Sequence, residues 1–129
     1  DLEPERLWAS LRAGRAVASL GLFLEVEAVR GEERAGPGEA ISPGADMQLN
    51  LRVQAPSWMQ VDRLRIYRGG VSVVDEAVTA DAAPLQLART ITATAADGDH
   101  YIVEVRGQSS APFVDTPIAV SNPIWVEAR

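Results

Sequence analysis

The sequence has 129 residues, the length of one domain, and 47% of them are hydrophobic, so the chain can fill a core of its own. It contains no cysteine, which excludes disulfide bonds, thiolate metal sites and cysteine nucleophiles. Its formal net charge of −6 argues against nucleic-acid binding, because a clustered basic surface supplies most of that affinity. No apolar run approaches the roughly 20 residues that cross a bilayer, so we expect no membrane span.

Residues 3 to 14 predict the only helix of the chain. Pro4 suits the first helical position, the acidic residues beside it complement the helix N-terminus, and Gly14 fits a C-terminal stop. A helix this short is marginally stable by itself, so its apolar side must pack against something. That apolar side is a stripe formed by Leu7, Trp8 and Leu11.

From residue 22 the pattern changes to the two-residue period of strands. The clearest case is 47 to 54, where every second residue from Met47 to Val53 is apolar. Gly69-Gly70 predicts a tight hairpin turn. The segment 31 to 44 is so rich in glycine and proline that we expect no element in it. Predicted strands cover residues 22 to 29, 47 to 54, 61 to 68, 71 to 78, 85 to 94, 100 to 106, 118 to 121 and 124 to 128.

This alternation predicts sheets with one face buried and one face in water. In the strand at 85 to 94, for example, we expect Leu85, Leu87 and Ile91 on the buried face. Two such sheets packed face to face are the simplest way to cover all the apolar faces. We therefore expect an all-β fold, an immunoglobulin-like β-sandwich of about seven or eight antiparallel strands, preceded by one short N-terminal helix.

Residues that carry chemistry are few. Asp97, Asp99 and His100, the only histidine, form either a metal or acid–base cluster or a solvated hairpin turn. We favour the turn, because the spacing lacks the further carboxylates of a calcium loop. A serine triad built from residues 109–110, His100 and Asp115 has no Gly-x-Ser-x-Gly motif to support it. The sequence therefore predicts no catalytic residue and no metal ligand in this chain.

Two groups of surface residues are candidates for binding. Trp58, in a loop that leads into a strand, is either a loop-end platform for a sugar ring or a plug that closes the sandwich with Met59, and we favour the plug. Trp125, in the last strand, is expected near the core. The outer face of the strand at 61 to 68 either meets solvent or contacts another domain, and it presents Arg63, Arg65 and Tyr67.

Three segments carry a resemblance: LWASLRAGRAVASLGLFLEV, VQAPSWMQVDRLRIYRGG and PFVDTPIAVSNPIWVEA. In this order they resemble the C-terminal part of CehA/McbA-type metallohydrolases of the polymerase-and-histidinol-phosphatase (PHP) superfamily. Where that family commonly has Asn-Gly-Pro, this chain has Leu20-Gly21-Leu22. The matching residues are Leu11, Arg12, Gly14, Arg15, Gly21, Phe23, Leu24, Trp58, Val61, Asp62, Ile66, Tyr67, Asn122, Pro123, Ile124 and Trp125.

The resemblance implies that the metal ligands lie in an α/β barrel upstream, since none of them maps onto this chain. Residues 1–21 would be the helix and strand remnant of that catalytic PHP domain, and residues 22–129 a C-terminal accessory β-sandwich. The upstream domain would be the partner in cis, and its divalent metal ions the cofactors, with none held by this chain. The implied domain-interface residues are Leu7, Trp8, Leu11, Arg15, Gly21, Phe23, Arg63, Arg65 and Tyr67.

We therefore expect a non-catalytic accessory domain that packs on and supports a bacterial PHP-type metal-dependent hydrolase of the phosphoesterase class. Because the first residue is Asp1 and not methionine, we expect the chain to be a piece of a longer protein. Export of that protein to the periplasm would depend on a signal peptide upstream of this piece. In isolation the helix could pair two copies into a homodimer. The alternative is an independent carbohydrate- or protein-binding β-sandwich module of a bacterial surface protein.

Overall fold

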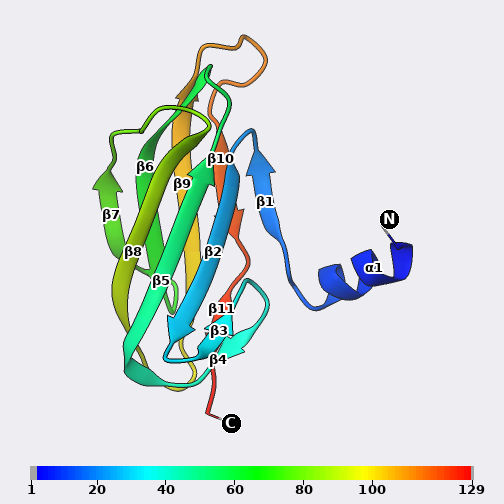
Figure 1. Cartoon of the computed structure of the whole chain (residues 1–129), viewed down its shortest axis with the longest axis vertical. Coiled ribbons are helices and arrows are strands. Elements are labelled where there is room, and N and C mark those ends of the chain that lie inside the picture. Colours follow the sequence, from blue (N-terminus) through cyan, green and yellow to red (C-terminus); the bar gives the residue numbers. More distant parts are fainter. Residues whose placement is uncertain (1–2, 129) are drawn as a thin grey trace.

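Two β-sheets pack face to face in the computed structural model, which describes residues 3–128 (Figure 1). The expected all-β sandwich with one short N-terminal helix is confirmed. The strands outnumber the seven or eight expected, because several short ones complete the sheets. In chain order the elements are α1 Pro4–Arg12, β1 Val17–Leu20, β2 Phe23–Arg30, β3 Glu33–Ala35, β4 Ala40–Ile41, β5 Gly44–Gln54, β6 Met59–Arg68, β7 Val71–Ala77, β8 Leu85–Ala95, β9 His100–Ser109, β10 Ile118–Ser121 and β11 Ile124–Val126.

The larger sheet has seven strands and is centred on β9. One edge of β9 pairs with β6, which pairs in turn with β7. The other edge of β9 pairs with β11 at its start and with β10 farther along. Beyond these two strands, β11 pairs with β4, and β10 pairs with β1. The smaller sheet has the order β3-β2-β5-β8 and is antiparallel throughout. The expectation of purely antiparallel strands is wrong at one place, since β11 and β4 are parallel.

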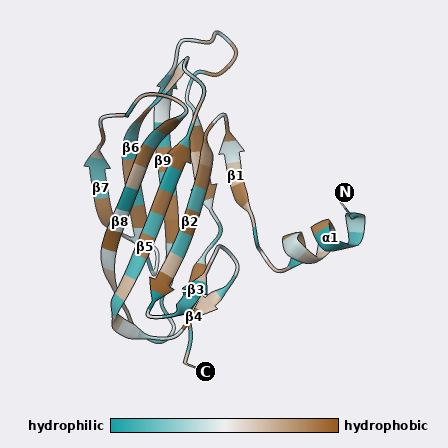
Figure 2. Ribbon diagram, viewed as in Figure 1, coloured by the Kyte–Doolittle hydropathy of each residue, from teal (hydrophilic) through white to brown (hydrophobic). Residues whose placement is uncertain are grey.

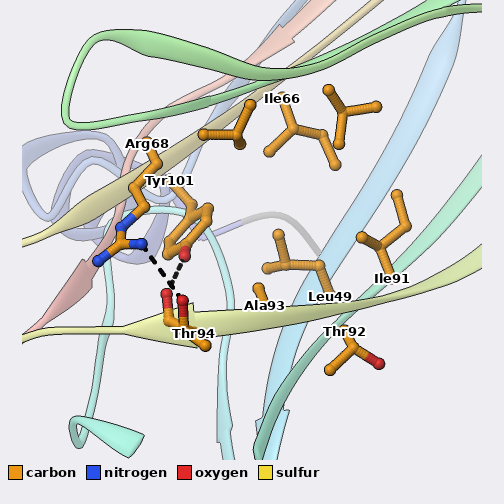
Figure 3. A pocket seen from close by; sticks show the side chains of 10 residues that line it. Leu49, Ile66, Arg68, Ile91, Thr92, Ala93, Thr94 and Tyr101 are labelled. Carbon is orange, nitrogen blue, oxygen red and sulfur yellow. Dashed lines mark hydrogen bonds between the residues drawn. The ribbon is translucent and has the colours of Figure 1, made fainter. Parts of the chain in front are cut away.

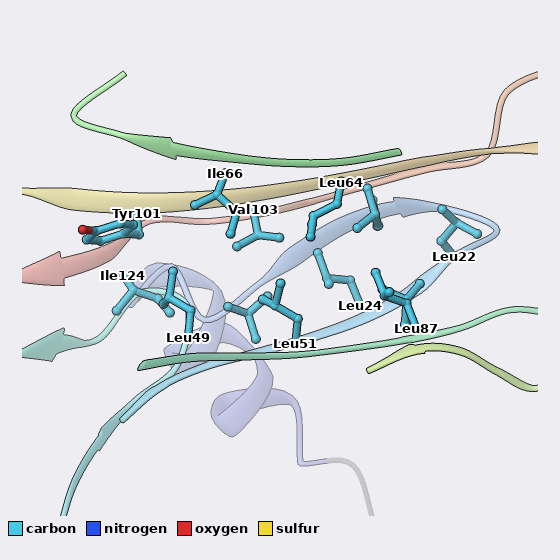
Figure 4. Close-up of a cluster of buried hydrophobic side chains, with 14 of the residues drawn as sticks. Leu22, Leu24, Leu49, Leu51, Leu64, Ile66, Leu87, Tyr101, Val103 and Ile124 are labelled. Carbon is cyan, nitrogen blue, oxygen red and sulfur yellow. The ribbon is translucent and has the colours of Figure 1, made fainter. Parts of the chain in front are cut away.

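The core fills the space between the sheets and follows the predicted alternation (Figures 2 and 4). In β5 every second residue from Met47 to Val53 is buried, as expected. Each fully buried aliphatic side chain stabilises the fold by about 1.5–3 kcal/mol. The largest fully buried side chains include Leu22, Ile41, Leu49, Leu51, Leu64, Ile66 and Ile124.

Two local expectations meet different outcomes. The Gly69-Gly70 turn between β6 and β7 is confirmed, with φ angles of 55° and 82° that suit a primed hairpin turn. The segment 31 to 44 does contain strands, β3 and β4, so the expectation of no element there is wrong. The physical reason is tertiary: Ala35 and Ile41 are buried, and the pairing partners come from β2 and β11.

Helix α1 forms at the predicted place but does not pack on the sandwich. Pro4 occupies its first turn, Arg12 its last, and it lies away from both sheets (Figure 1). None of its residues is buried, so of the partners open to its apolar stripe the sandwich of the same chain is excluded, and packing on another domain or on a second copy stays a prediction. Within residues 3–128, no helix has the length and apolar character needed to cross a membrane.

Candidate functional site

Exposed large apolar side chains are concentrated in the N-terminal segment of the chain. Among the described residues ten such side chains are exposed, and half of them precede residue 24. Trp8 is 62% and Phe23 is 60% exposed. Single exposed apolar residues are normal on a protein surface, but their frequency within residues 7–23 makes this segment the candidate contact region of the chain. We call this set the N-terminal apolar surface; it comprises Leu7, Trp8, Leu11, Leu20 and Phe23.

A junction fixes the C-terminal end of α1 to the sandwich. The side-chain amide of Asn122 donates a hydrogen bond of 2.9 Å to the carbonyl oxygen of Gly14, and its backbone N–H donates one of 3.0 Å to Ala16. Arg15 forms an ion pair of 3.3 Å with Glu39 in the β3–β4 loop. The structure thus brings together segments 14–16, 36–39 and 122–123, which are far apart in the sequence.

Gly21 lies where the chain crosses from the larger sheet to the smaller one. A Cβ atom built on Gly21 would be 2.6 Å from the sulfur of Met59, so the backbone packs directly against that side chain. Leu20 and Phe23, on either side of the crossing, are exposed, whereas Leu22 between them is buried. The interface candidates Gly21 and Phe23 therefore differ in role: Gly21 allows close packing, and Phe23 presents apolar surface.

Arg63, Arg65 and Tyr67 lie on the outer face of β6, as expected, but apart from the N-terminal apolar surface. Two strands, β9 and β10, separate β6 from β1 in the sheet. The Nε atoms of Arg63 and Arg65 lie 2.6 and 3.1 Å from Oδ1 of Asp75, and Arg65 also contacts Glu104 at 3.4 Å. These ion pairs satisfy the arginines within the domain, and nothing in the geometry joins them to α1.

The Arg63–Asp75–Arg65 cluster gives a testable pKa. The hydrogen bond from Arg63, followed by that from Arg65, lowers the pKa of Asp75 from 3.8 to about 2. Because the folded-state pKa is the lower one, the pairing stabilises the fold above pH 3.8, and this contribution is lost as pH falls toward about 2. Carboxyl NMR titration should show this value, and Arg63→Gln should raise it toward 3.8. Arg52→Gln, on the other sheet, should leave it unchanged; equal effects would contradict the assignment.

Trp58 does not close the end of the sandwich. Met59 is buried there and forms the plug, but Trp58 is 51% exposed, so the expectation that both residues plug the end is wrong for Trp58. Its indole borders an open hollow of about 250 Å³. We call this the Trp58 hollow; it is lined by Ser57, Trp58, Gln60, Gln108, Ser109 and Ser110.

The acidic turn before β9 is held by hydrogen bonds within the domain. Asp99 accepts hydrogen bonds from the Ala96 backbone N–H at 2.9 Å and from Arg68 at 2.7 Å, and these lower its pKa. Asp97 accepts one from the N–H of Ala128 at 2.7 Å. Within residues 3–128, no three acidic or histidine side chains lie close enough to hold a metal ion.

His100 and the nearby serines do not form a triad. His100 begins the ten-residue strand β9 and Ser109 ends it, so nine steps of extended strand, roughly 30 Å, separate them. The imidazole instead packs against Trp125, with ring centroids 5.3 Å apart. Trp125 is 41% exposed, so the expectation that it lies near the core is wrong.

A further cavity, missed from the sequence, opens on the flank between β7 and β8 (Figure 3). It has a volume of about 180 Å³, and its inner walls include Leu49, Ile66 and Ile91. At one end the Tyr101 hydroxyl donates to the carbonyl oxygen of Thr94, and Arg68 donates to the Thr94 hydroxyl at 3.2 Å. No carboxylate or imidazole lines it, so it contains no acid–base pair.

Comparisons with known proteins found no matching family model, no matching curated protein and no matching solved structure.

Proposed function

We propose that this chain is a non-catalytic accessory domain of a larger metal-dependent hydrolase of the PHP superfamily, of the phosphoesterase class. In this proposal its N-terminal apolar surface packs on the catalytic domain upstream. The observation that carries the proposal is the exposure of the apolar stripe on α1. A nine-residue helix is marginal in water, and covering Leu7, Trp8 and Leu11 with a partner would stabilise it.

The junction supports a role in orientation. The hydrogen bonds from Asn122 and the ion pair between Arg15 and Glu39 hold the end of α1 at a fixed place on the sandwich. A catalytic domain packed on α1 would therefore take a defined position relative to both sheets. The resemblance in the three sequence segments points to the same class of parent protein. The catalytic residues and divalent metal ions would belong to the upstream domain.

The test is Trp8→Asp in the complete product of the gene and in the 129-residue chain alone. In the complete protein, loss of a buried tryptophan should lower the free energy of unfolding by about 2 kcal/mol. In the isolated chain the effect should stay within about 0.5 kcal/mol, because Trp8 is 62% exposed there and has little buried surface to lose. Urea unfolding of both proteins measures the difference. Hydrolysis of bis(p-nitrophenyl) phosphate with Mn²⁺ is expected only from the complete protein.

Ala9→Asp is the matched control, since it places the same charge on the opposite side of α1 and should leave both proteins unchanged. Equal effects of the two substitutions in the complete protein would contradict the docking proposal. So would a gene product without a catalytic domain before residue 1. Sedimentation velocity tests whether α1 instead binds a second copy of the chain. If the isolated chain is a dimer that Trp8→Asp dissociates, and the same substitution has no effect on the complete protein, then α1 serves self-association.

A further inference from the structure

The Trp58 hollow combines an aromatic platform with free hydrogen-bonding groups. Trp58 is held in place through its backbone, because its carbonyl oxygen accepts bonds from the N–H and the hydroxyl of Ser110, at 2.9 and 3.3 Å. The buried side chain of Met59 anchors the next residue. The backbone that carries the exposed indole is therefore held in place. This rigidity lowers the entropy cost of binding a ligand on it.

Two glutamines form the floor beside the indole. Gln60 of β6 and Gln108 of β9 are directly opposite each other in the sheet, and both are exposed. Neither side-chain amide makes a hydrogen bond to another residue of the described chain. Each amide can therefore offer two N–H donors and one carbonyl acceptor to a ligand. The hydroxyl groups of three serines complete the lining.

The lining identifies the chemical class of the ligand. None of its residues is charged, although 23% of the chain is Asp, Glu, Lys or Arg, so the ligand should be neutral. A pyranose ring fits this chemistry: its apolar C–H face packs on the electron-rich face of an indole, and its rim of hydroxyls both donates and accepts hydrogen bonds. The volume of about 250 Å³ lies below the range typical of larger ligands, and it suits a single ring.

We propose that the Trp58 hollow binds one pyranose ring of a neutral glycan, stacked on the indole of Trp58 and hydrogen-bonded by Gln60 and Gln108. We expect a dissociation constant on the order of 1 mM, since one platform and a few solvent-exposed hydrogen bonds supply little net free energy. No residue of this site belongs to the N-terminal apolar surface, so its failure would leave the docking proposal unaffected.

The experiment is an NMR titration of the isotope-labelled chain with cellohexaose, chitohexaose, maltohexaose and laminarihexaose. At least one of them should shift the indole signal of Trp58 and the backbone amides of residues 57–60 and 108–110. Trp58→Ala should weaken binding by about tenfold or more, and Trp58→Phe should weaken it less. Gln60→Ala and Gln108→Ala should each weaken it several-fold.

Trp125→Ala is the matched control, because this half-exposed tryptophan lies beside the opposite end of β9 and should leave binding unchanged. Melting temperatures of all variants show that the fold is intact, and the two glutamine variants test the site even if Trp58→Ala does not fold. The proposal is overturned if none of the four glycans shifts the signals of the hollow. It is also overturned if a proline-rich peptide shifts them and the glycans do not.

Discussion

Replacing Gln86 with leucine should lower the free energy of unfolding by about 3 kcal/mol, because two buried backbone groups lose their hydrogen-bond partner. Gln86 belongs to β8 in the smaller sheet and is only 2% exposed. Its side-chain amide crosses to β6 in the larger sheet, where it accepts a bond of 2.9 Å from the N–H of Val61 and donates one of 2.5 Å to the carbonyl oxygen of Met59. This part of β6 extends beyond the end of β7, so Gln86 takes the place of the missing strand.

Leucine has a similar volume, so the expected loss comes from hydrogen bonding and not from a cavity. Gln48→Leu is the control, since Gln48 is an exposed glutamine of β5 and its replacement should change the free energy of unfolding by less than about 0.5 kcal/mol. Urea unfolding and thermal melting would measure both variants. A Gln86→Leu protein as stable as the parent chain would show that the sheets do not depend on this bridge.

Sequence patterns predicted those elements whose signal is local. In β5 alternation alone placed Met47, Leu49, Leu51 and Val53 correctly, because no bulge interrupts the strand between them. In β8 the same reasoning is confirmed for Leu87, which is buried, and for Ile91, which packs against the core, but it is wrong at the start of the strand. A register shift opposite Val53 and Gln54 places Gln86 and Leu87 both in the interior, so the polar residue is buried and Leu85 is only half-buried. A bulge depends on the neighbouring strand, and the period of one strand cannot predict it.

In the candidate site, too, the sequence predicted the local features and not those that depend on tertiary contacts. The helical spacing of Leu7, Trp8 and Leu11 predicted an apolar stripe, and the structure contains it. Where that stripe finds its partner is a tertiary question, and the structure leaves the stripe exposed. The junction could not be predicted either, because Gly14 and Asn122 are 108 residues apart and meet only through the sheet order. Trp58 was ambiguous in the sequence, since a loop tryptophan can point inward or outward.

Gly38→Ala should release the end of α1 from the sandwich and lower the free energy of unfolding by about 2–3 kcal/mol. Gly38 has a φ angle of 80°, which costs an alanine free energy. A Cβ atom there would lie 2.3 Å from the carbonyl oxygen of Ala13 and 2.4 Å from the carbonyl carbon of Gly14. Both are backbone atoms and cannot rotate away, so the two segments of the junction must separate.

Amide hydrogen exchange measures this separation directly. The N–H of Gly38 is bonded to the carbonyl of Pro123, and that of Asn122 to Ala16, so both should exchange faster in Gly38→Ala. Gly36→Ala is the control within the same loop: its Cβ would lie 3.7 Å from Glu39, an ordinary contact, and stability should change by less than about 0.5 kcal/mol. Because the junction sets where α1 stands on the sandwich, the docking proposal predicts that Gly38→Ala also weakens the contact of α1 with an upstream domain in the complete protein. Unchanged exchange at Gly38 and Asn122 would mean that the close approach at Gly38 does not hold the junction together.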